Sequence, residues 1–198
     1  MGKIFYIMGK SSTGKDTIFK RLLMDEELAL KPYVIYTTRP IREGERQGQE
    51  YYFTDEEGLE QIQREGRLIE VRSYDTVFGV WKYFTADNEN VDLERESYLM
   101  IGVLDSFRAV REYYGRDRVI PIYLEVEDGE RLQRALDRGR QEQRPGYLEM
   151  CRRFLTDSED FSEERIRAEQ IDRRFYNREL EDCLEEIRTF ILDICSHS

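Results

Sequence analysis

Histidine is nearly missing from this chain of 198 residues, and its one copy, His197, is the penultimate residue. Because chain ends usually fray, we expect no imidazole-based acid–base catalysis, which excludes hydrolases with Ser-His or Cys-His pairs. Cysteine is also scarce. Cys151, Cys183 and Cys195 show neither C-x-x-C spacing nor a histidine cluster, so they predict reduced thiols rather than a zinc site or a disulfide scaffold.

Long hydrophobic runs are absent as well. The first apolar run, Ile4–Met8, has five residues before a glycine, far fewer than a signal sequence or a membrane span needs. The net charge of −11, from 42 acidic and 31 basic residues, opposes binding to a nucleic-acid backbone or an anionic membrane. We therefore expect a cytoplasmic protein without nucleic-acid or membrane partners.

The apolar residues that are present alternate between strand-like and helix-like patterns. The run Ile4–Met8 is typical of a strand buried on both faces. From Lys15, a helical stripe runs toward Leu28 and stops near Pro32. Residues 98–103 and 119–126 predict two strands, with a helix between them at 107–114. Residues 178–195 predict a closing amphipathic helix. This alternation predicts an α/β fold with a parallel sheet.

Two regions between these segments differ from the predicted core. Residues 36–90 are polar, aromatic and rich in glycine, with strand-like pieces at 50–53 and 67–72. Residues 131–168 are hydrophilic, helical in pattern and rich in arginine. We therefore expect one domain whose core comprises about residues 1–35, 95–130 and 169–198, with the two regions as excursions.

A phosphate-binding loop is predicted where the first strand passes into the first helix. The segment fits G-x-x-x-x-G-K between a strand and a helix, where backbone N–H groups and the helix dipole favour an anion such as ATP. Its residues are Gly9, Lys10, Ser11, Ser12, Thr13, Gly14, Lys15, Asp16 and Thr17. Lys15 can reach the outer phosphates. Asp16 stands where the general pattern has serine or threonine, so Mg²⁺ is expected to contact Asp16 through water.

A second anion site is predicted in the segment from Thr37 to Phe53. Two arginines and a tyrosine, Arg39, Arg42 and Tyr51, suit a phosphate, and Glu45 can orient a guanidinium. The segment resembles the guanylate kinase pattern T-T-R-x-x-R-x-G-E-x-x-G-x-x-Y. Its matching positions are Thr37, Thr38, Arg39, Arg42, Gly44, Glu45, Gly48 and Tyr51.

This resemblance to guanylate kinases implies a three-layer P-loop kinase core with a parallel sheet, a small acceptor-binding subdomain and a helical lid. The implied substrates are ATP, bound with Mg²⁺, and GMP. Arg39, Arg42 and Tyr51 would hold the phosphate of GMP, and Glu70 would accept hydrogen bonds from guanine. The remaining positions that the resemblance implicates are Phe78 and Gly79 for the acceptor, Lys15, Arg138 and Arg153 for catalysis, and Asn177 for adenine.

The lid is predicted from a cluster of arginines, because arginines of such kinases close over the phosphoryl group that is transferred and stabilise its charge. The cluster comprises Arg131, Arg134, Arg138, Arg140, Arg144, Arg152 and Arg153. Arg152 rivals Arg153 as the second lid arginine.

Three substitutions leave other acceptors open. Ile35 replaces a serine that binds the base, Phe78 replaces a phosphate-binding tyrosine, and Val80 replaces a hydroxyl residue. One alternative is a kinase for another nucleoside monophosphate or for ribose 1,5-bisphosphate, whose kinases have a loop similar to that of residues 14–17. The other is an inactive phosphopeptide-binding module, although such modules characteristically lose the loop lysine and the lid arginines.

Overall fold

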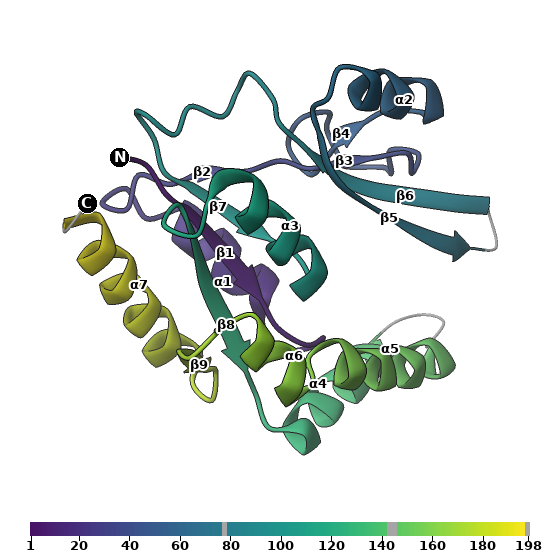
Figure 1. The fold of residues 1–198 in the computed structure, drawn as a ribbon. Coiled ribbons are helices and arrows are strands. Elements are labelled where there is room, and N and C mark those ends of the chain that lie inside the picture. Colours follow the sequence, from purple (N-terminus) through teal and green to yellow (C-terminus); the bar gives the residue numbers. More distant parts are fainter. Residues whose placement is uncertain (77–78, 142–145, 197–198) are drawn as a thin grey trace.

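A five-stranded parallel sheet forms the centre of the molecule in the computed structural model, which describes residues 1–76, 79–141 and 146–196 (Figure 1). Its strand order is β2-β7-β1-β8-β9. The strands are β1 (Ile4–Met8), β2 (Lys31–Pro32), β7 (Tyr98–Ile101), β8 (Val119–Glu125) and β9 (Arg174–Tyr176). All five residues of β1 are buried because β1 lies at the centre of the sheet with a helical layer on each face.

Helices cover both faces of this sheet and give a three-layer core. The helices α1 (Lys15–Leu23) and α7 (Leu180–Ser196) pack on one face, where Phe5 and Ile7 point. On the other face α3 (Leu104–Tyr114) packs against Tyr6 and Met8. Alternate residues of β1 therefore enter opposite hydrophobic cores, as the period of a strand requires.

A second, four-stranded sheet lies beside the core, with strand order β4-β3-β6-β5 (Figure 1). Its strands are β3 (Tyr36–Thr37), β4 (Tyr52–Phe53), β5 (Leu68–Thr76) and β6 (Gly79–Ala86). The helix α2 (Glu56–Arg64) covers one face, and Asp55 caps it by accepting from the N–H of Gly58. The other face is turned toward the core, because β5 packs against α3.

Three helices follow β8 and contain the arginine cluster. They are α4 (Asp128–Gln141), α5 (Tyr147–Asp160) and α6 (Glu163–Ala168). The helices α4 and α5 pack against each other at one end of the molecule (Figure 1). Arg144 lies outside the described residues.

The fold class predicted from the sequence is confirmed, but the end of the first helix was predicted wrongly. Helix α1 ends at Leu23 and does not continue toward Leu28. The side chain of Asp25 accepts hydrogen bonds from the N–H groups of Glu27 and Leu28, which a longer helix would bond to carbonyls. Ala29 then takes a left-handed conformation, and the chain enters β2 at the edge of the sheet.

Candidate functional site

The loop between β1 and α1, residues 9–14, requires glycine at both of its ends. Gly14 has a φ of +87°, and a Cβ atom there would lie 2.5 Å from Nδ2 of Asn177. A Cβ atom on Gly9 would lie 2.4 Å from the carbonyl oxygen of Leu124 in β8. The loop is therefore packed tightly against the ends of β8 and β9, and the sequence motif coincides with a conformation that side chains would obstruct.

Polar side chains of the loop mostly bond to the loop itself. The carbonyl of Lys10 accepts from Thr13 Oγ1 at 2.8 Å and from Lys15 Nζ at 3.0 Å. Burial lowers the pKa of Lys15, and the carboxylates of Asp16 and Asp157 oppose this shift. The buried hydroxyl of Ser12 has no hydrogen-bond partner within the described part of the chain. This hydroxyl and the ammonium group of Lys15 are thus polar groups that an anionic ligand could engage.

Asn177 braces the loop from the end of β9. Its side chain donates from Nδ2 to the carbonyl of Thr13 at 2.8 Å, and the residue is 3% exposed. Its Oδ1 is buried and has no partner among residues 1–76, 79–141 and 146–196. Asn177 therefore lies beside the loop, with an acceptor atom to spare.

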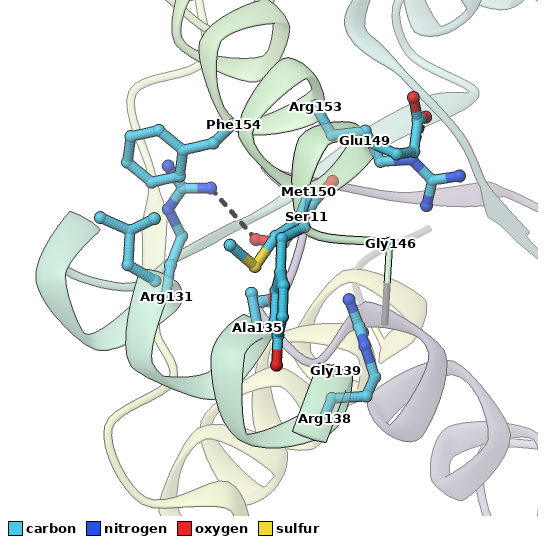
Figure 2. Close-up of a pocket in the computed structure, with 13 residues that line it drawn as sticks. Ser11, Arg131, Ala135, Arg138, Gly139, Gly146, Glu149, Met150, Arg153 and Phe154 are labelled. Atoms are coloured by element: carbon cyan, nitrogen blue, oxygen red, sulfur yellow. Dashed lines mark hydrogen bonds and ion pairs between the residues drawn. The ribbon is translucent and has the colours of Figure 1, made fainter. Parts of the chain in front are cut away.

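Two residues of α4 and α5 form hydrogen bonds with the backbone of Ser11. Arg131, which is 1% exposed, donates to the carbonyl of Ser11 at 3.1 Å, and Asp157 accepts from the N–H of Ser11 at 2.7 Å. Arg131 also donates to Asp128 and lies under the ring of Phe154, as Figure 2 shows. Sequence reasoning missed the role of Asp157, because nothing in its local pattern distinguishes it from a surface carboxylate.

A cavity of about 190 Å³ is lined by residues of the loop, α4 and α5 (Figure 2). Ser11 and Ser12 line one side, and Arg138 and Arg153, from α4 and α5, line the other. Glu149 accepts from Arg153 Nε at 2.9 Å and from Arg152 at 2.6 and 2.7 Å. Hydrogen bonds from Arg152, and then from Arg153, lower the pKa of Glu149 to about 2. The structure thus brings Arg138 and Arg153 to the cavity, while Arg152 is not among its lining residues.

The predicted phosphate clasp is built around a buried guanidinium. Arg39 is 3% exposed and donates to both oxygens of Glu45, at 2.8 and 3.0 Å. The rings of Tyr51 and Phe53 each lie 5.4 Å from its central carbon. Glu45 also accepts from the N–H of Arg42 at 2.8 Å, and its pKa is lowered by Arg39 first and by this N–H next. The ion pair therefore fixes the loop that carries Arg42.

Of the other residues predicted to bind the acceptor, only Tyr51 lies beside Arg39. The side chain of Arg42 is exposed, whereas Tyr51 is half-buried beside Arg39. Glu70 points toward the core and accepts from Ser106 at the start of α3. Gly79 begins β6 with a φ of +110°. Phe78, which the sequence also implicated, lies outside the described residues.

The glycine loop and Glu70 lie at the same edge of the central sheet. The glycine loop follows the C-terminal end of β1, and Gly102 follows the C-terminal end of the neighbouring parallel strand β7. Glu70 reaches that edge through its hydrogen bond from Ser106. Ligand sites in open α/β sheets form at the carboxyl ends of the strands, so this is the expected place for two ligands to meet.

Comparisons with known proteins agree with this arrangement. The guanylate kinase family model matches residues 1–193. The chain belongs to the guanylate kinase family. It is 31% identical to the guanylate kinase of Porphyromonas gingivalis over 194 residues, which cover 96% of this chain and 97% of that protein. It is also 31% identical to the guanylate kinase of Mycoplasmoides gallisepticum over 197 residues, 96% of this chain and 92% of that one.

A solved structure of the family has the same fold. The crystal structure of guanylate kinase from Anaplasma phagocytophilum superposes with a TM-score of 0.65 over 97% of this chain and 85% of that one. The identity is 23%, so this likeness concerns the fold alone. The guanylate kinase family thus accounts for the sheet order, the excursion and the helices α4–α6 together.

In residues 1–76, 79–141 and 146–196, no group of three or more His, Cys, Asp or Glu side chains could hold a metal ion. Asp16 lies exposed in the first turn of α1, next to Thr17. None of the helices in these residues is long and apolar enough to cross a bilayer.

Proposed function

We propose that this member of the guanylate kinase family transfers the γ-phosphoryl group of ATP to the phosphate of GMP, giving ADP and GDP. The observation that carries the proposal is the match to the family over residues 1–193, which includes the glycine loop and the Arg39–Glu45 segment. We further propose that the enzyme acts in the cytoplasm on these small-molecule substrates.

The glycine loop is the proposed site of the ATP phosphates. Its N–H groups and the N-terminus of α1 supply positive potential, and Lys15 contributes its ammonium group. Burial lowers the pKa of Lys15, and a bound anion would raise it again, because the anion favours the charged form of the lysine. We assign the free Oδ1 of Asn177 to the adenine amino group.

The acceptor phosphate is proposed to bind at Arg39, Arg42 and Tyr51. Two donors of Arg39 are engaged by Glu45, so its proposed role is to hold a fixed positive charge beside the Tyr51 ring. The side chain of Arg42 is exposed and can close on the acceptor phosphate. The acceptor phosphate is already an anionic nucleophile, so the reaction needs no general base. Alignment of the two polyanions and stabilisation of charge by Arg138 and Arg153 carry the chemistry.

The lid imposes one rearrangement. Arg153 is paired with Glu149, so it must exchange this carboxylate for phosphate oxygens during turnover.

Magnesium is proposed to accompany ATP and to contact Asp16 through water. A single carboxylate beside the phosphate loop suits this ion, which takes most of its ligands from nucleotide phosphates and water. When bound, the ion would neutralise charge on the outer phosphates. An Asp16→Ala variant with unchanged magnesium dependence would contradict this assignment.

The proposal is tested by coupled ADP release with ATP and a panel of acceptors: GMP, AMP, UMP and ribose 1,5-bisphosphate. We expect GMP to give the highest kcat/KM and Lys15→Ala to abolish turnover. Faster turnover of another acceptor would refute the assignment to GMP. Absence of ATP binding by calorimetry would instead favour a phosphopeptide-binding module, against which the presence of Lys15, Arg138 and Arg153 argues.

A further inference from the structure

Arg72 is a charged residue of β5 that the proposed function leaves without a role. Its guanidinium donates to Glu70, with Nε to Oε2 at 3.0 Å and Nη2 to Oε1 at 3.3 Å. Both side chains are largely buried, at 19% exposed for Arg72 and 10% for Glu70. A buried ion pair of this kind costs desolvation, so its retention calls for a function.

The pair faces the acceptor site. Glu70 and Arg72 are two residues apart on β5, so they share the face of the small sheet that is turned toward α3. Arg72 pairs in register with Tyr83 of β6, whose ring contacts that of Tyr51 at 5.5 Å. Arg72 therefore lies next to the phosphate clasp and between it and the core.

The hydrogen bonds of Glu70 leave one oxygen available. Oε1 accepts from Thr85 Oγ1 at 2.7 Å and from Ser106 Oγ at 2.9 Å, in addition to Arg72. Oε2 accepts only from Arg72 Nε within the described part of the chain. Glu70 can thus offer a ligand one further lone pair, on Oε2, rather than two free oxygens.

Arg72 is left with donors to spare. In residues 1–76, 79–141 and 146–196, its Nη1 has no partner, and its Nη2 makes only the long bond to Glu70. The hydroxyl of nearby Tyr6 is also buried and has no hydrogen-bond partner within these residues. The pair therefore presents a free acceptor and free donors side by side.

That order of groups matches one edge of guanine. Guanine has the acceptor O6 next to the donor N1–H, whereas adenine has a donor amino group next to the acceptor N1. A guanidinium facing position 6 and a carboxylate oxygen facing position 1 satisfy the first arrangement, whereas the same order sets donor against donor and acceptor against acceptor in adenine. Ile35, in the place where the family commonly has a base-binding serine, offers no hydrogen bond.

We propose that Arg72 is a specificity-determining residue, donating to O6 of the acceptor base while Oε2 of Glu70 accepts from N1–H. The inference rests on the proposed function and deepens it, because it names the chemical class of acceptor: 6-oxopurine nucleoside monophosphates. IMP, which has O6 and N1–H but lacks the 2-amino group, belongs to this class. AMP does not.

The test compares GMP, IMP and AMP at saturating ATP in the wild type and in the variants Arg72→Met, Arg72→Lys and Arg67→Met. Arg67 is the control, because it forms an ion pair of the same two-residue spacing with Glu65, one residue before β5, but in an exposed position. We expect Arg72→Met to lower kcat/KM for GMP and IMP alike by about tenfold to a hundredfold, the usual value of a good base contact. AMP and the KM for ATP should be unaffected, and Arg72→Lys should fall between.

Two outcomes would overturn the role assigned to Arg72. An equal loss with all three acceptors would overturn the inference, because Arg72 would then act on the phosphate or on stability. An unchanged ratio of GMP to AMP would overturn it as well. If Arg72→Met does not fold, by thermal unfolding, the same ratio in Arg72→Lys decides. A wild type that turns over another acceptor in place of GMP refutes the proposed function itself, a result distinct from either of these.

Discussion

The close approach of Gly14 and Asn177 predicts a measurable coupling between two positions of the proposed ATP site. Gly14→Ala places a methyl group 2.5 Å from Nδ2 of Asn177, at a φ of +87°. The left-handed conformation costs alanine about 1–2 kcal/mol. Displacing the Asn177 amide also breaks its bond to Thr13, which costs a further ~1–3 kcal/mol because the carbonyl is left unpaired.

The expected result is a loss of about 3 kcal/mol of unfolding free energy in Gly14→Ala, within the sum of these two contributions. For a chain of this length the loss corresponds to a fall in Tm of roughly 6–12 °C. Asn177→Ala alone loses the hydrogen bond but makes room for the methyl group. The double variant should therefore be more stable than the sum of the single losses predicts, by about 1 kcal/mol or more.

Urea unfolding and calorimetry of the four proteins measure this coupling. The KM for ATP should rise in both single variants, since each disturbs the loop proposed to hold the phosphates. Strict additivity of the two losses would refute the reasoning, because the clash and the broken hydrogen bond would then be independent. A Gly14→Ala variant as stable as the wild type would refute the assigned geometry as well.

Two further predictions concern helix α5. Asp157→Asn should lower the KM for ATP by about threefold to tenfold, because it removes the negative charge that lies at the N–H of Ser11 and repels phosphate; steady-state kinetics measure it. Glu149→Gln should be less stable than the wild type at neutral pH by at most about 1 kcal/mol, since the ion pairs with Arg152 and Arg153 are half-exposed. Because the pKa of Glu149 falls from 4.5 to about 2 on folding, this difference should be complete above pH 4.5 and vanish as the pH approaches 2 in urea unfolding.

Matched controls come from the same helix. Asp160→Asn removes a carboxylate that pairs with Arg165 and should leave the KM for ATP unchanged. An unchanged or higher KM for Asp157→Asn would show that Asp157 serves only to fix the lid. A stability difference for Glu149→Gln that persists at pH 2 would mean that the effect comes from packing and not from charge.

The sequence predicted those parts of the molecule whose conformation is decided locally. A continuous apolar run located β1, and the glycines of the loop marked the turn into α1, because a short apolar run and a positive φ are properties of neighbouring residues. The end of α1 was predicted wrongly. Asp25 ends the helix through bonds to two following N–H groups, and an ion pair with Arg188 holds its carboxylate there from α7.

The tertiary structure alone decided which side chains share a partner. Ser11 and Asp157 meet across 146 positions, and Glu70 meets Ser106 across 36. In sequence, a carboxylate that bonds to the loop, such as Asp157, cannot be told from a surface carboxylate. Neither periodicity nor spacing predicts which distant segments folding brings together. The sequence by itself therefore determined the fold class, and it predicted two segments as candidate anion sites. Only packing of the second sheet against α3, and of α5 against the loop, determined which donors and acceptors remain free for a ligand.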